Sequence, residues 1–112
     1  MEFQMVTKSD KKTKQSPCPV TKTMQVIGGK WKPMILFNLL SGRKRFNELQ
    51  RLAGNPSARV LTLQLRELED DKIIKRDVFD QIPPRVEYSL TTKGKSLSSV
   101  LEMMANWGQT HG

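Results

Sequence analysis

A short apolar helix, a tight turn and a longer leucine-rich helix follow one another in the middle of this chain, and they restrict the fold more than any other feature. Residues 46–52 carry an apolar side chain at every third position, and residues 57–71 carry leucines four and three positions apart. These side chains are Phe46, Leu49 and Leu52 in the first stretch and Leu61, Leu65 and Leu68 in the second. The turn between them reads Gly-Asn-Pro, which is typical turn chemistry. The pattern therefore predicts a helix-turn-helix unit.

Two more helices are expected upstream of this unit. The first covers residues 19–27, where a proline suits the first helical turn and a glycine pair ends the helix. The second covers residues 31–40 and is nearly all apolar, which is typical of a central core helix. Residues 1–17 are polar and Lys-rich without apolar periodicity, so we expect a disordered basic arm before one ordered domain over residues 18–110.

Two strands and a last helix are expected downstream. Residues 73–79 and 85–90 have strand character, and the Pro-rich loop 80–84 joins them as an antiparallel pair with a long tip. A final helix, capped by one of two threonines at its start, is expected over residues 91–107. A hairpin directly after a helix-turn-helix is the layout of a winged helix-turn-helix. We therefore predict a mostly helical α+β fold, with dimerisation helices at both ends.

The charge of the chain indicates a polyanionic partner. Lys and Arg number 19 against 11 Asp and Glu, which gives a net charge of +8 at pH 7. A domain this basic usually binds nucleic acid or an acidic membrane surface, and a solvated surface without such a partner is the alternative. No apolar run is long enough to span a bilayer, and no signal segment is visible, so a cytoplasmic protein without membrane attachment is expected.

Catalysis has little support in the composition. The chain holds one histidine and one cysteine and has no Gly-rich phosphate loop. We therefore expect no enzyme, no cofactor and no metal, with chemistry by carboxylates alone as the open exception.

Four sequence segments carry a family resemblance. The strings IGGKW, RFNEL, LTLQLRELE and PPRVEYSLT occur in this order, and together they resemble the HxlR-type regulators, bacterial winged-helix transcription factors related to the MarR group. The resemblance covers residues 18–107. It implies a homodimer held by the first and last helices, and control of transcription, with repression as the expected sign. The Gly-Asn-Pro turn and Leu63 depart from the family pattern, so the operator sequence cannot be copied from relatives.

The longer helix of the unit is the expected recognition helix. Its candidate DNA-contacting residues are Ser57, Arg59, Thr62, Leu63 and Arg66. Arg59 and Thr62 lie in the first two turns, which usually face the base edges. Arg59 can make a bidentate contact to guanine or bind a phosphate, and Leu63 can pack on thymine methyl groups. The alternative is a solvated face on which the arginines pair with Glu67 and Glu69.

The hairpin tip and the ends of the core helix supply the other candidates. Arg85 follows two prolines that stiffen the loop, which favours its insertion into a narrow minor groove. The alternative is a turn arginine paired to Asp80. Six further residues are candidates for phosphate contacts, with plain solvation as the alternative. They are Lys30, Lys32, Arg43, Lys44, Arg45 and Asn47.

Cys18 directly precedes the first helix. The positive end of the helix dipole and the unpaired N–H groups there favour a thiolate, and Lys22 lies one turn further on. The family resemblance implies a sensor of small electrophiles or oxidants near this position, whereas the alternative is a small residue without a role. One cysteine per chain restricts the chemistry to a disulfide between subunits, a mixed thiol cap, a sulfenic acid or alkylation.

Apolar stripes on the first and last helices predict the dimer interface. Its expected members are Val20, Met24, Leu97, Leu101, Met104 and Trp107. Trp31 and Trp107 are assigned to the core or this interface rather than to base stacking.

The predicted function is a sequence-specific DNA-binding regulator that recognises a palindrome as a homodimer. Two alternatives are a winged-helix module that binds protein without specific DNA binding, and a regulator that responds to a non-covalent ligand. RNA binding is disfavoured because interleaved aromatic residues are lacking.

Overall fold

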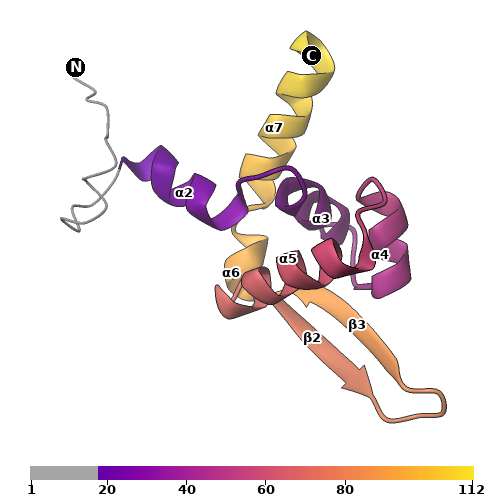
Figure 1. The fold of residues 1–112 in the computed structure, drawn as a ribbon. Coiled ribbons are helices and arrows are strands. Elements are labelled where there is room, and N and C mark those ends of the chain that lie inside the picture. The colour runs from indigo at the N-terminus through magenta and orange to yellow at the C-terminus, as the bar shows by residue number, and fades with distance from the viewer. Residues whose placement is uncertain (1–17) are drawn as a thin grey trace.

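The computed structural model describes residues 18–112, and the predicted basic arm at residues 1–17 lies outside them. The elements in chain order are α2 (Pro19–Ile27), α3 (Lys32–Leu39), β1 (Lys44–Arg45), α4 (Phe46–Leu52), α5 (Ala58–Asp70), β2 (Ile74–Phe79), β3 (Arg85–Leu90), α6 (Thr92–Lys95) and α7 (Ser98–His111). Helices α3, α4 and α5 gather in the body of the molecule, and the β2–β3 hairpin extends from it (Figure 1). Helices α2 and α7 project away from this body. The predicted α+β class with a winged helix-turn-helix layout is confirmed.

One apolar core joins the three central helices to the base of the hairpin. The leucine stripe of α5 is buried as predicted, with Leu61, Leu65 and Leu68 at most 1% exposed. The other buried apolar side chains come from α2, α3, α4 and its C-cap, the hairpin and its approach, and α7: Ile27, Ile35, Leu36, Leu39, Leu49, Ala53, Ile73, Ile74, Tyr88, Leu90 and Leu101. The burial of so much apolar surface between these elements fixes how α5 and the hairpin sit relative to each other.

Two predicted helices are each one residue shorter at both ends in the structure. Trp31 and Leu40 are the caps of α3, and Ser57 and Asp71 are the caps of α5. Cap residues continue the sequence pattern of the helix, so the pattern includes them. They lack part of the helical backbone hydrogen bonding, so the helix in the structure excludes them.

The sheet has three strands in the order β1-β3-β2. Strands β2 and β3 pair antiparallel from Ile74↔Leu90 to Phe79↔Arg85, as the sequence predicts. Strand β1 was not predicted. It pairs Lys44 with Tyr88, and a strand of two residues carries no alternating pattern that a sequence reading can detect.

The predicted last helix is two helices. Thr91 caps α6, because its hydroxyl accepts a hydrogen bond from the Gly94 N–H at 3.0 Å. Helix α6 closes in a tighter turn, in which the Leu97 N–H bonds the Gly94 carbonyl, and α7 starts afresh at Ser98. The break allows Leu97 to pack against the core while α7 leads away from it. None of the described helices has the length and apolar character that crossing a membrane requires.

Candidate nucleic-acid interface

The turn between α4 and α5 is held in one conformation by local chemistry. Gly54 and Asn55 both have positive φ, at +94° and 58°, a region that glycine and asparagine enter most easily. The Asn55 N–H donates to the Gln50 carbonyl at 2.8 Å, and Gln50 Nε2 donates to the Pro56 carbonyl at 3.0 Å. Ser57 then caps α5, since its hydroxyl accepts from the Val60 N–H at 3.1 Å. The start of α5 is therefore rigidly placed.

The solvent face of α5 carries the residues that the sequence singled out. Arg59, Leu63 and Arg66 are exposed and Thr62 is half-buried, opposite the buried leucine stripe. Leu63 is 53% exposed, on the face of α5 that points away from the buried leucines. Neither arginine forms an ion pair within residues 18–112, so the predicted alternative of pairing with Glu67 and Glu69 is not what the structure shows.

Lys32 does not belong to this surface, which corrects its assignment to phosphate contacts. Its Nζ lies 2.7 Å from Glu67 Oε1, and its side chain is only 11% exposed. The ion pair links the first turn of α3 to α5. Lys32 is buried because it stands on the face of α3 that packs against α5, and a lysine there needs a carboxylate partner.

Arg85 of the hairpin is held by two neighbours. Its Nε lies 3.1 Å from Glu87 Oε2, and its guanidinium stacks 4.9 Å from the centre of the Phe79 ring. The acidic partner of Arg85 is therefore Glu87, which lies two residues further along β3 and so projects from the same face of the strand. It is not Asp80, the partner considered from the sequence. Arg43 approaches the same pair, with its Nη1 3.3 Å from Glu87 Oε1 and its guanidinium 5.9 Å from the Phe79 ring.

A groove between α4 and the hairpin brings three predicted residues together. Arg45, Asn47 and Arg85 line this groove of about 420 Å³ beside Pro83 and Pro84. Arg45 and Asn47 are exposed at the start of α4, where the Glu48 carboxylate caps the helix by accepting from the Arg45 N–H at 2.9 Å. Their position at one edge of the hairpin suits contacts to one nucleic-acid backbone.

Two further predicted lysines lie elsewhere. Lys30 is exposed, and its ammonium lies 4.7 Å from the centre of the Trp31 ring. Lys44 turns back toward the end of α3, where its Nζ donates to Ser41 Oγ at 3.0 Å and to the Gly42 carbonyl at 3.3 Å.

Arg76 is a candidate that the sequence reading missed. It lines a small hollow of about 250 Å³ between α5 and the sheet, together with Thr62, Arg66 and Tyr88. Strand alternation was the available signal, because Arg76 pairs with the buried Tyr88 and so projects from the sheet face that meets α5.

Cys18 is exposed at the N-cap of α2, and its carbonyl accepts from the Lys22 N–H at 3.1 Å.

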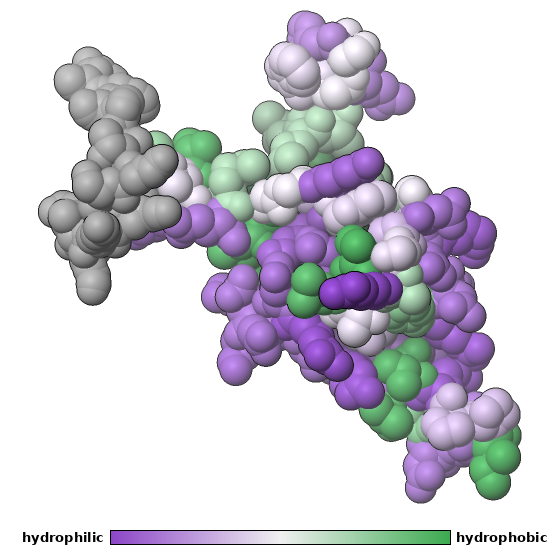
Figure 2. Space-filling model, in the orientation of Figure 1, coloured by the Kyte–Doolittle hydropathy of each residue, from purple (hydrophilic) through white to green (hydrophobic). Residues whose placement is uncertain are grey.

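Helix α2 and the outer part of α7 carry exposed apolar side chains: Val20, Met24, Val100, Met103, Met104 and Trp107. Figure 2 shows apolar surface on both helices, whereas the body below is mostly hydrophilic. Leu101 and Leu97 of the predicted interface pack instead on the core of the same chain, Leu101 at 2% exposure.

A short and a longer helix joined by a tight turn, followed by a β-hairpin, define a winged helix-turn-helix protein. The family model of the HxlR-like helix-turn-helix matches residues 26–112. The chain therefore belongs to the HxlR-like family and is a helix-turn-helix transcriptional regulator. The members it resembles are regulators of this kind rather than enzymes.

Relatives and solved structures agree with this assignment. The uncharacterized HTH-type transcriptional regulator YdeP of Bacillus subtilis is 51% identical over 94 residues, which are 84% of this chain and 73% of that protein. The redox regulator HypR in its oxidized form superposes with a TM-score of 0.81 at 48% identity, over 85% of this chain and 98% of that chain. The reduced form of YodB from B. subtilis gives 0.72 at 32% identity, over 86% and 95%.

Proposed function

We propose that this regulator binds duplex DNA sequence-specifically, as a homodimer on a palindromic operator, and represses transcription there. The observation that carries the proposal is the row on α5 formed by Arg59, Leu63 and Arg66, which is exposed and free of ion pairs within the described residues. The row lies opposite the buried leucines of α5. Its arginines can bind the acceptor atoms of guanine in a major groove, and its leucine can pack on thymine methyl groups.

The remaining contacts follow from the placement of α5. With α5 in the major groove, Arg59 and Thr62 face base edges, and Arg45 and Asn47 at the start of α4 face the phosphates. Arg85 at the hairpin supplies the minor-groove contact. Its pairing with Glu87 and its stacking on Phe79 hold the side chain in one place before DNA arrives.

The homodimer is proposed from the apolar faces of α2 and α7. Val20, Met24, Met104 and Trp107 are between 43% and 67% exposed, and a second copy can cover the apolar faces that they form on the two helices. Recognition of a palindrome requires that the two-fold axis of this dimer place the two α5 helices about one turn of DNA apart.

Fluorescence anisotropy with the regulator's own upstream region tests specific binding. Wild-type protein should bind a palindrome far better than scrambled DNA, with an affinity that falls steeply with salt. Arg59→Ala should weaken operator binding about tenfold or more, since it removes one base contact from each half-site. Lys22→Ala removes the same charge from α2 and should bind as the wild type does. Equal affinity for scrambled DNA would support a protein-interaction module instead.

Release of DNA through Cys18 is the proposed signal. The thiol is exposed, and the HypR structures are those of a redox regulator in oxidized and reduced forms. Diamide, an azo oxidant, takes two electrons and two protons from two Cys18 thiols, so that a disulfide links the subunits and diamide becomes the hydrazine. Diamide should weaken operator binding by the wild type and leave Cys18→Ser unchanged. A Cys18→Ser protein that still releases DNA would contradict the signal.

A further inference from the structure

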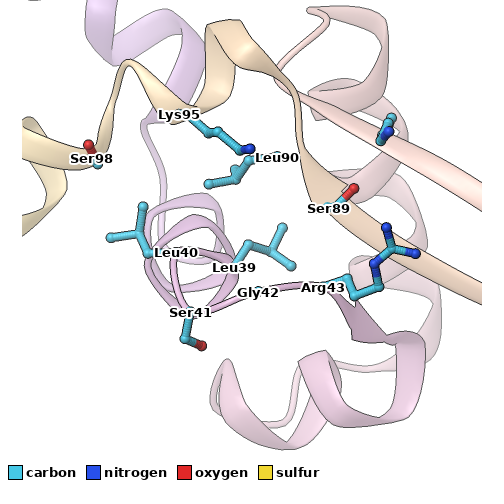
Figure 3. Close-up of a pocket in the computed structure, with 10 residues that line it drawn as sticks. Leu39, Leu40, Ser41, Gly42, Arg43, Ser89, Leu90, Lys95 and Ser98 are labelled. Carbon is cyan, nitrogen blue, oxygen red and sulfur yellow. The ribbon is translucent and has the colours of Figure 1, made fainter.

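A groove of about 550 Å³ lies where the end of α3, the base of the hairpin and the start of α7 meet. Its size falls within the range of small-molecule sites. Leu39 and Leu40 form one side, and the Lys95 side chain runs alongside Leu90 on the other (Figure 3).

The polar lining of this groove is entirely cationic or hydroxylic. Arg43, Lys75 and Lys95 supply the charges, serine hydroxyls supply further donors, and no acidic residue lines it. The Lys95 side chain makes no hydrogen bond or ion pair within residues 18–112. The Ser89 hydroxyl is buried and has no hydrogen-bond partner among the described residues. Arg43 and Lys75 already pair with Glu87 and Asp77 at 3.3 Å and 4.0 Å, so the unpaired Lys95 ammonium and the unpartnered Ser89 hydroxyl are the groups that indicate a site for an oxyanion.

We propose that this groove binds a small amphipathic anion, with a carboxylate or phosphate head group on an apolar body. Arg43, Lys95 and Ser89 hold the head group, and Leu39, Leu40 and Leu90 cover the body. A fully hydrophilic anion would leave the leucine side of the groove without a partner, whereas a neutral apolar molecule would leave the Lys95 ammonium and the Ser89 hydroxyl without one.

The groove is separate from the DNA-reading helix. Lys75 and Ser89 are paired positions of β2 and β3, and the adjacent pair Arg76↔Tyr88 lines the hollow against α5. Since successive side chains of a strand point to opposite faces, Lys75 and Ser89 project from the sheet face away from α5. A ligand there leaves the recognition helix uncovered.

Arg43 connects the groove to the hairpin arginine. It lines the groove and pairs with Glu87 Oε1, while Glu87 Oε2 pairs with Arg85 Nε. An anion that draws Arg43 into the groove removes one of the two arginines that share the Glu87 carboxylate. Glu87 then attracts Arg85 more strongly, which makes Arg85 less available to DNA. The anion therefore weakens operator binding, a consequence that rests on the proposed function.

Titration of the full chain with benzoate and with phenyl phosphate, followed by amide chemical shifts, tests the site. Saturable shifts should centre on Gly42, Arg43, Ser89 and Lys95, and the anion that binds tighter identifies the head group. Lys95→Gln should weaken binding about fivefold, as expected for one lost charge-assisted contact. Lys93→Gln removes the same charge from the same helix outside the groove and should bind as the wild type does. Equal binding by Lys95→Gln, or by neutral benzamide, would overturn the proposal.

Operator binding in the presence of the anion tests the coupling separately. At matched ionic strength, the tighter anion should weaken DNA binding by the wild type and by Lys93→Gln more than chloride does, and Lys95→Gln should not respond. An anion that binds without this effect overturns the coupling alone. If no operator is bound at all, the proposed function fails, and the shift titration still decides on the groove.

Discussion

A single lysine shows how burial changes the role of a charge. The Lys32 ammonium lies 2.7 Å from Glu67 Oε1, with 11% of its side chain exposed, whereas 48% of the Glu67 side chain is exposed. The lysine therefore depends on the glutamate more than the glutamate depends on the lysine, because water can solvate the carboxylate but reaches the ammonium poorly.

Glu67→Gln should lower the free energy of unfolding by about 1–2 kcal/mol, because it leaves a buried ammonium without its counter-charge, and partial exposure of the pair keeps the loss below that of a fully buried one. Glu69→Gln removes the same charge from the same helix without breaking an ion pair, and its effect should stay within about 0.5 kcal/mol. Urea unfolding at constant protein concentration measures both. Equal midpoints for the two variants would show that the ion pair does not contribute.

The burial of the α5 leucines can be predicted from the neighbouring sequence, whereas the burial of Lys32 cannot. Leu61, Leu65 and Leu68 were predicted to be buried because helical periodicity records burial directly, and they are at most 1% exposed. The burial of Lys32 depends on Glu67, 35 positions away in the sequence. The Arg85–Glu87 pair depends on which strand face each residue takes and on the ring of Phe79. Neither local composition nor period encodes such partners.

At the scale of elements, the junction of β2 with α6 holds the hairpin to the body. Thr91 Oγ1 donates to the Lys72 carbonyl at 2.7 Å, and the Thr91 N–H bonds the Ile73 carbonyl at 3.0 Å. Gly94 then lies so close to the strand that an added Cβ would stand 2.1 Å from the Ile73 carbonyl oxygen. The backbones of α6 and β2 therefore approach in a way that only glycine permits.

Gly94→Ala should destabilise the fold by about 2 kcal/mol or more, because the Cβ meets backbone that has no room to move without shifting the hairpin. Gly108→Ala is the matched change in α7, where an added Cβ meets nothing within 4 Å. Alanine favours a helix interior over glycine, so this variant should be stabilised by about 0.5–1 kcal/mol. Thermal unfolding compares the two, and a Gly94→Ala protein as stable as the wild type would contradict the close approach.

The elements that the sequence predicted well are those with enough residues to show a period. The helix pair and both hairpin strands were placed within one residue of their ends, because each has a stripe or an alternation along its length. Strand β1 spans two residues, and the break at Ser96 and Leu97 is set by local hydrogen bonds and by the packing of Leu97. Both depend on tertiary contacts that a single sequence does not display.

For the whole molecule, α2 and α7 are the exception to a well-covered core. Both helices leave the body with apolar side chains facing solvent, and Met103, Trp107 and Val20 are each at least 65% exposed. Several large apolar side chains exposed on the same two helices argue for a partner surface.

Met104→Glu should dissociate the proposed dimer, because a two-fold interface places the new carboxylate in the apolar contact twice. Burial of an unpaired charge costs several kcal/mol, so the dimer dissociation constant should rise by about thirtyfold or more. Sedimentation velocity across micromolar concentrations measures the change. Gln109→Glu adds the same charge near the end of α7 at a position that is already polar, and this variant should sediment as the wild type does.

Operator binding adds a second readout. A monomer contacts one half-site and loses the affinity gained from binding two half-sites at once, so Met104→Glu should bind a palindrome no better than a single half-site. A Met104→Glu protein that sediments as a dimer would show that this face of α7 is not the dimer interface, and its exposed apolar residues would then need another explanation.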